Sequence, residues 1–340
     1  MAAEFYTLPP EKIAQEPPKI RGASRLLVLH RDTKKLEDKR YADVIDYLEP
    51  GDVLVLNDTK VMPARLIAQF ADGRERELML TEKHARELPE TQAQVVYRGK
   101  LRAGDELYVG DEELRVLEML EGGQAIIEAD RSIAEIADEY GATPLPPYIR
   151  REANQDDVKR YQTVFAQEAG SVAAPTASLN MTDELLRAIK EKGIEVVYLT
   201  LHVGRGTFLP IRSEKIDQHK MHEEYFEIPE CTLEKIRIAK EKGGRVVALG
   251  TTVTRALEYA AQDIQMSGAS TVHGEADIFI HPGYEFLVVD ALLTNFHAPE
   301  STVIQLAAAF AGEDFLKSAY EHALKNNYRF LSYGDSMFVI

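Results

Sequence analysis

Three segments of this chain carry histidines in settings that suit proton transfer. His202 precedes Gly204 and Gly206, and the absence of side chains at these glycines permits close approach of the backbone. His297 follows Asn295 by two positions, so in an extended segment both side chains lie on the same face. An imidazole ionises near neutral pH and can take up and release a proton. Histidines are also often structural, so both roles stay open here.

The third segment contains His219 and His222, which are three residues apart. That spacing permits metal ligation on a helix, but no third ligand lies nearby in the sequence and no helix-start signal precedes the pair. We therefore expect no metal site. General acid–base work by His222, or a hydrogen-bonded pair with Glu223, fits the sequence better.

Residues 171–182 form an almost uncharged run within a highly charged chain. Pro175 fixes the backbone locally, and Ser171, Thr176 and Ser178 supply short hydroxyls. Thr182 then precedes two acidic residues, which is typical of a helix N-cap. The run predicts either a loop that holds a ligand or a tight connection into a helix.

Gly250-Thr251-Thr252 follows an apolar run and opens a predicted helix. Such a turn can bind a carboxylate or phosphate on its backbone amides, or it can be an ordinary helix start. No lysine follows in the pattern of a phosphate-binding loop, and no dinucleotide-binding glycine pattern is present.

Composition limits the possible functions. The chain has 340 residues, a formal net charge of −16 and one cysteine, Cys231, so an intramolecular disulfide and a cysteine-rich metal site are excluded. We expect a cytoplasmic protein without a signal peptide or membrane span. The acidity argues against non-specific nucleic-acid binding. Two local basic groups are either solvated faces or binding patches: Arg98, Lys100 and Arg102, and Arg150, Arg151, Lys159 and Arg160.

The elements that must position these residues fall into two patterns. Residues 66–142 contain short alternating segments separated by glycines, which predict a small antiparallel β-barrel-like domain. Residues 1–65 and 143–340 contain apolar runs that alternate with amphipathic segments, which predict a mixed-sheet α/β main domain interrupted by that insertion. In its last third we expect strands at 277–280 and 286–290 and helices at 299–311 and 314–326. Polar residues at the strand ends are the expected site.

Taken together, these segments resemble the S-adenosylmethionine:tRNA ribosyltransferase-isomerase family of the queuosine pathway. The resemblance spans nearly the whole chain, in the same order. Its segments are Ser24–Leu29, Leu56–Arg65, Tyr161–Ala166, Gly170–Ala177, Leu201–Gly204, His219 with Met221-His222, Gly250–Thr252, Ile278–Ile280, Pro282–Tyr284, Thr294–His297 and Ser332–Asp335.

The resemblance implies an activity. The family transfers and isomerises the ribosyl part of S-adenosylmethionine onto 7-aminomethyl-7-deazaguanine at the wobble position of the tRNA anticodon loop. Epoxyqueuosine-tRNA forms, and adenine and methionine leave. The implied partners are tRNA and S-adenosylmethionine, with no metal or other cofactor and no membrane, and we expect a monomer. The family's α/β body with an inserted β-domain agrees with the pattern above.

The resemblance also implies roles for particular residues. A sulfonium acidifies the adjacent ribose carbon, so the catalytic candidates are the histidines, with Asp335 orienting a base or binding the substrate amine. Tyr161, Phe208 and Tyr333 are candidates for stacking on a base, although aromatic residues more often pack in cores. The full set is His202, His297, His222 and Asp335 as catalytic residues, and Arg25, Asn57, Thr59, Arg65, Tyr161, Thr163, Ser171, Pro175, Thr176, Gly204, Gly206, Thr207, Phe208, Thr251, Thr252, Asn295 and Tyr333 as substrate-binding residues.

The chain departs from the family's usual pattern at four positions. Ser178 replaces a glycine, Asn180 a histidine, Met181 a phenylalanine, and Arg205 a small residue. An asparagine cannot shuttle protons, so any such duty of the usual histidine would be lost. Two alternatives therefore stay open: a paralogue that uses S-adenosylmethionine with another acceptor, and a silent scaffold that binds tRNA or nucleosides.

Overall fold

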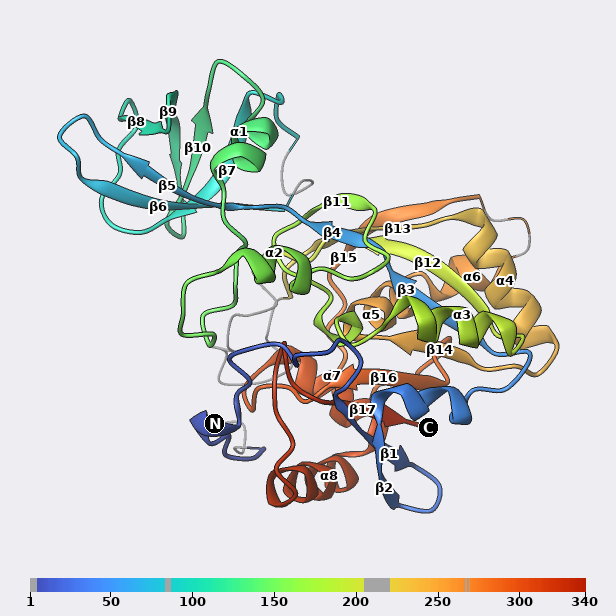
Figure 1. The fold of residues 1–340 in the computed structure, drawn as a ribbon. Coiled ribbons are helices and arrows are strands. Elements are labelled where there is room, and N and C mark those ends of the chain that lie inside the picture. Colours follow the sequence, from blue (N-terminus) through green and yellow to red (C-terminus); the bar gives the residue numbers. More distant parts are fainter. Residues whose placement is uncertain (1–4, 83–86, 205–220, 267, 269) are drawn as a thin grey trace.

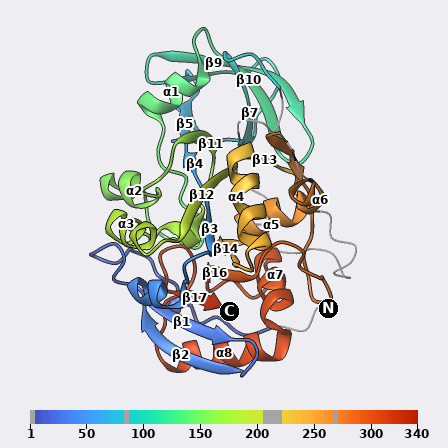
Figure 2. The same ribbon diagram turned by 90° about the vertical axis from the view of Figure 1, so that its right-hand side faces the viewer.

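The computed structural model describes residues 5–82, 87–204, 221–266, 268 and 270–340. The chain forms an α/β body and a closed β-barrel, which stands at the top of both views beyond the short strands β4 (Thr59–Val61) and β11 (Glu168–Ser171) (Figures 1 and 2). This confirms the predicted mixed-sheet α/β domain with a small antiparallel barrel.

A nine-stranded mixed sheet runs through the body, in the order β15-β13-β12-β3-β14-β16-β17-β1-β2. Four neighbours at its centre, β12, β3, β14 and β16, are parallel, so their carboxyl ends meet at one edge. The strands are β1 (Arg25–His30), β2 (Lys35–Arg40), β3 (Val53–Asn57), β12 (Glu195–Leu201), β13 (Glu224–Ile228), β14 (Val246–Leu249), β15 (Val272–Ala276), β16 (Ala291–Asn295) and β17 (Ser336–Val339).

The inner strands β1, β3, β14, β16 and β17 bury side chains on both faces, whereas the edge strand β2 has no buried residue. In β1, Leu27 and Leu29 face one core, and Leu26 and Val28 face the other, as the two-residue period of a strand requires. The first core is completed by α4 (Glu230–Glu241), α5 (Thr251–Tyr259), α6 (Ala261–Gln265), α7 (Thr302–Ala311) and α8 (Glu313–Lys325). The second is completed by the 3-10 helices η2 (Tyr41–Tyr47) and η3 (Thr176–Ser178) and by α3 (Asp183–Glu191).

The barrel has six antiparallel strands in the order β10-β7-β6-β5-β8-β9, closed around its own core. The chain leaves the body and re-enters it at one point, where Arg65 and Ala142 pair through two backbone hydrogen bonds. The barrel elements are β5 (Arg65–Gln69), β6 (Glu75–Leu80), β7 (Gln92–Tyr97), β8 (Glu106–Val109), β9 (Glu112–Leu120), β10 (Gln124–Glu128) and the covering helix α1 (Ile133–Tyr140).

Short elements join the two parts. The strands β4 (Thr59–Val61) and β11 (Glu168–Ser171) pair in parallel between the sheet and the barrel. Helix α2 (Gln155–Arg160) is capped by Asn154, and η1 (Pro10–Lys12) lies near the start of the described chain.

Two predicted strands are wrong. Residues 277–280 and 286–290 are irregular, and the strands lie beside them at β15 and β16. Ile280, Val288 and Val289 are buried, whereas Leu287 is exposed, and several backbone groups here bond to side chains instead of a neighbouring strand. The amides of Leu287, Val288 and Val289 donate to the Glu258 carboxylate, and Arg255 donates to the Ile278 carbonyl.

In the part of the chain that the structure describes, no helix is long and apolar enough to cross a membrane.

Candidate functional site

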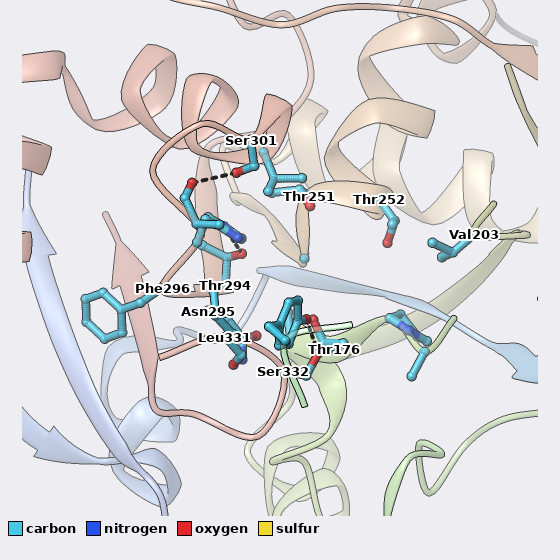
Figure 3. A pocket seen from close by; sticks show the side chains of 18 of the residues that line it. Thr176, Val203, Thr251, Thr252, Thr294, Asn295, Phe296, Ser301, Leu331 and Ser332 are labelled. Carbon is cyan, nitrogen blue, oxygen red and sulfur yellow. Dashed lines mark hydrogen bonds between the residues drawn. The ribbon is translucent and has the colours of Figure 1, made fainter. Parts of the chain in front are cut away.

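A cavity of about 280 Å³ opens at the carboxyl edge of the central strands (Figure 3). This is near the lower end of the size range of small-molecule sites, roughly 300–1,000 Å³. Its walls come from the loop after β11, the start of α5, the segment after β16, and the turn before β17. Four separate parts of the sequence therefore converge on one enclosed space.

The segment after β16 supplies two polar groups. Asn295, Phe296 and His297 all lie along the cavity, and the Phe296 side chain is fully buried in the core and points away from the other labelled side chains in Figure 3. Asn295 donates from Nδ2 to the Leu331 carbonyl at 3.0 Å, but its Oδ1 is buried and accepts no hydrogen bond from any described residue. An unsatisfied buried acceptor is costly, so this wall is prepared for a donor.

His297 is held firmly at both backbone groups. Its N–H donates to the Tyr320 hydroxyl at 2.9 Å, and the Tyr6 hydroxyl donates to its carbonyl. The ring nitrogen Nε2 lies 3.1 Å from the Thr294 hydroxyl. Burial lowers the pKa of His297 to about 3, because the charged imidazolium loses its hydration. The side chain is therefore neutral at physiological pH.

The start of α5 forms another wall. Gly250 has a φ of 100° and a Cβ there would lie 3.3 Å from that of Ala177, so glycine suits both the turn and the space. Thr251 and Thr252 line the cavity. Asn57, at the end of β3, donates to the Thr252 hydroxyl at 3.4 Å and to the Leu201 carbonyl at 2.9 Å, which ties three strand ends together.

The small-residue loop forms the facing wall. Pro175 and Thr176 line the cavity at the start of η3, and Thr182 caps α3 by accepting from the Leu185 amide at 3.2 Å. The loop is thus both a cavity wall and a connection into a helix. Tyr148 lies beside it, with its hydroxyl 2.6 Å from that of Ser332 across the cavity edge.

Several predicted site residues lie behind the cavity wall and support it. Ser171 is one of them: its hydroxyl accepts a hydrogen bond at 2.6 Å from the amide of Val203, which lines the cavity. His202 bonds to the Thr59 hydroxyl at 2.8 Å and stacks on the Tyr225 ring. A Cβ at Gly170 would lie 2.6 Å from the His202 ring, so the glycine here makes room for this imidazole. Gly204 donates its amide to Glu224.

Other predicted site residues lie elsewhere. Arg25 pairs with Asp38 and covers the Tyr328 ring, and Asp335 accepts from the backbone amides of Arg25 and Arg329. Tyr161 and Tyr333 pack edge to face on each other in a small separate core. Thr163 is buried with them, and Arg65 lies at the junction with the barrel. None of these six side chains lines the cavity.

Some predictions fall outside what the structure describes. Arg205, Gly206, Thr207, Phe208 and His219 lie in the segment 205–220, outside the described residues. His222 is described and exposed, and its carbonyl lies 3.5 Å from Arg255. Among the described residues, no three histidine, cysteine, aspartate or glutamate side chains gather as metal ligands.

Three of the four unusual positions have structural roles. Asn180 accepts from the Ser24 hydroxyl at 2.7 Å and donates to the Gly334 carbonyl and the Ser336 hydroxyl, so it ties η3 to β1 and β17. Met181 is fully buried in the core beneath α3, and Ser178 is buried as well. None of the three lines the cavity.

Sequence reasoning did not assign to the site several polar residues that line the cavity, namely Tyr148, Thr294, Glu300, Ser301 and Ser332. Ser332 stood inside a recognised motif, but its neighbours Tyr333 and Asp335 were chosen because they carry the more reactive groups. Glu300 is the only carboxylate among the described residues that line the cavity, and it lies between the histidine segment and the helix cap Ser301. Tyr148 had no local signal.

Known proteins resemble this chain over its whole length. A sequence model of the family described as queuosine biosynthesis protein matches residues 3–339. Relatives named S-adenosylmethionine:tRNA ribosyltransferase-isomerase include one from Pelodictyon phaeoclathratiforme, 53% identical, and one from Chlorobaculum parvum, 55% identical, each over 98% of both chains. A crystal structure of the S-adenosylmethionine tRNA ribosyltransferase from Thermotoga maritima is 37% identical, with a TM-score of 0.57 over 99% of this chain and 100% of that one.

Proposed function

The chain belongs to the queuosine biosynthesis family, and from this premise we propose that its cavity is where the ribosyl group of S-adenosylmethionine is transferred and isomerised. The acceptor is 7-aminomethyl-7-deazaguanine in tRNA, and the products are epoxyqueuosine-tRNA, adenine and methionine. The chain is thus a transferase and isomerase of tRNA modification.

One observation supports this placement above the others. Four segments that carry the family resemblance, 170–177, 250–252, 294–297 and 332–335, each supply residues to the same cavity. Three of them adjoin the neighbouring strands β14, β16 and β17, so the sheet brings them to one edge, and the loop after β11 joins them from outside this sheet. The polar groups gathered there suit a small-molecule substrate.

The polar groups of the cavity suit a cationic nucleoside donor. Glu300 supplies a negative charge at the rim, where it can pair with the sulfonium or the α-ammonium group of S-adenosylmethionine. The open Oδ1 of Asn295 can accept from the adenine amino group or a ribose hydroxyl. The hydroxyls of Thr176, Thr251 and Thr252 can bond the remaining polar atoms.

Among the catalytic candidates, His297 is the imidazole that lines the cavity. We propose that it receives the proton from the ribose carbon next to the sulfonium. The electron pair left on that carbon forms an ylide, whose collapse expels adenine and leads to the epoxide. A neutral histidine has a lone pair available to accept this proton, although its lowered pKa makes it a weak base. His202, one layer behind, positions the Val203 wall.

The proposal needs no cofactor beyond the donor substrate. We propose that the chain works as a monomer. A chain with a single cysteine and a tRNA substrate is proposed to work in the cytoplasm.

The test is an incubation with S-adenosylmethionine and tRNA that bears the aminomethyl base. We expect release of adenine and formation of epoxyqueuosine in the tRNA. Adenine without modified tRNA would instead identify a paralogue with another acceptor. Binding of both substrates without adenine release would identify a silent scaffold.

A further inference from the structure

A second hollow, of about 550 Å³, lies between the barrel and the body. It is lined by barrel residues of β6 and β7 and by the segment 143–153, which leads from the barrel back to the body. We infer that this groove binds the phosphodiester backbone of the tRNA next to the modified base. The inference rests on the proposed function and adds the surface that holds the polymer.

Charge separates this groove from the rest of the molecule. The whole chain carries a formal charge of −16, yet the described residues that line the groove include four arginines and two acidic residues, which leaves an excess of positive charge among these side chains. The arginines are Arg65, Arg98, Arg150 and Arg151, and the acidic residues are Glu77 and Glu152. Arginine clusters neutralise phosphates and favour association with RNA.

The four arginines fall into two pairs. Arg65 bridges Glu77 of the barrel and Glu152 of the body at 3.1 and 3.0 Å, and Arg151 is bound to Asp157 and Glu16. These two hold the groove together. Arg98 is 75% exposed, with its nearest carboxylate oxygen 3.8 Å away, and the Arg150 guanidinium makes no hydrogen bond or ion pair with any described residue. Arg98 and Arg150 are therefore the cations left for an outside anion.

The groove also lies next to the cavity. Pro147 and Ile149 line the groove, whereas Tyr148 between them lines the cavity, so one segment separates the two spaces. In the same way Val172 faces the groove and Ala174 the cavity. A strand held in the groove can thus present a neighbouring unstacked base to the cavity, and Tyr97 offers it a ring for stacking.

The experiment measures tRNA binding to the full chain by fluorescence anisotropy across a range of salt concentrations. Arg98→Ala combined with Arg150→Ala is expected to weaken binding about tenfold per arginine, since charge-assisted bonds are among the stronger ones. The slope of log K against log salt should shrink by roughly 0.7–0.9 per lost contact. Arg98→Lys combined with Arg150→Lys should retain most of the affinity for tRNA, because lysine keeps the positive charge.

Arg187→Ala is the matched control, since Arg187 lies on α3 and is 70% exposed, much like Arg98. The inference would be overturned if the double variant bound tRNA with the same affinity and the same salt slope as this control. Failure of the parent chain to bind tRNA would overturn it as well. By contrast, normal tRNA binding that depends on Arg98 and Arg150, without adenine release, would support the groove and refute the proposed reaction.

Discussion

The cavity and the groove share a wall but differ in size and in charge. The described residues that line the cavity carry mostly apolar groups and hydroxyls, with one amide, one neutral imidazole and one carboxylate. The groove is lined by four arginines, two of them tied to acidic residues, together with apolar residues of β6, β7 and the segment 143–153. A small cavity with few charges suits a small ligand whose atoms must be placed accurately. A larger groove that carries several arginines suits a polymer that is held by many weak contacts.

The comparison explains how an acidic protein can act on RNA. Net charge describes the surface as a whole, whereas binding depends on the local arrangement of a few side chains. Arg98 and Arg150 are 52 positions apart in the sequence, and the pairing of Arg65 with Ala142 at the base of the barrel brings both to one groove.

The largest effect is expected from His297→Gln. If the cavity performs the chemistry, loss of its imidazole should lower kcat at least about hundredfold, as removal of a general base usually does. Binding of tRNA should be unchanged, because the groove is untouched. His322→Gln, on α8, is the control. An unchanged kcat for His297→Gln would move the base out of this cavity.

The next largest effect is expected from salt concentration, which should weaken ligand binding at the groove but not at the cavity. Raising the salt concentration from about 50 to about 200 mM is expected to weaken tRNA binding about tenfold if two phosphate contacts are lost to screening. Binding of S-adenosylmethionine should change little, since the cavity has one rim carboxylate. Titrations of each substrate alone at both salt concentrations check this, and equal sensitivity would contradict the division.

A smaller effect is expected from Glu300→Gln. The change removes the rim charge but keeps the side-chain shape, so the affinity for S-adenosylmethionine should fall a few-fold, as is usual for an exposed ion pair. Affinity for tRNA should not fall. Glu321→Gln on α8 controls for the change in net charge. Calorimetric titration measures both, and equal donor affinity in the two variants would remove Glu300 from the site.

The buried imidazole also predicts how stability depends on pH. Since its pKa is lowered to about 3 from an ordinary 6.5, the unfolded chain takes up this proton more readily than the folded one. The stabilisation is full above pH 6.5 and is lost as the pH falls toward 3. Chemical unfolding of the parent and of His297→Gln should therefore show the parent losing stability more steeply on acidification. Parallel curves would mean that His297 is hydrated.

The smallest effect on turnover is expected from Asn180→His. Because Asn180 bonds three segments below the cavity and does not line it, restoring the family's usual histidine should leave kcat unchanged. The free energy of unfolding should drop by about 1–3 kcal/mol, since a buried network is broken. Thermal unfolding beside the adenine-release assay separates the two quantities. A higher kcat would show that this chain is functionally divergent at position 180.

Much of the fold was accessible from the sequence because periodicity reports burial. The apolar runs of β1 and β3 and the short alternating strands of the barrel were recognised for this reason. The strand β2 was missed, since Lys35–Arg40 is a charged edge strand with no buried residue. The segment 286–290 looked like a strand because it is apolar, but its amides satisfy the Glu258 carboxylate, a contact that no local pattern reveals.

The candidate site was predictable to the level of segments and less so to the level of side chains. The local sequence pattern singled out Asn295 and His297, which both line the cavity. It could not show that Asp335 would be used by two backbone amides or that Tyr333 would turn toward Asp157, leaving Ser332 at the cavity. Such outcomes depend on contacts across the whole chain.

The parallel pairing of β1 with β17 has a consequence for synthesis in the cell. At about 5–20 residues per second, a ribosome completes β17 roughly fifteen seconds to a minute after β1 has emerged. During that interval the apolar stretch Leu26–Leu29 has only its hairpin partner β2, and its other edge is unpaired. An unpaired hydrophobic edge invites aggregation, so the nascent polypeptide has a built-in need for chaperone protection until its final strand arrives.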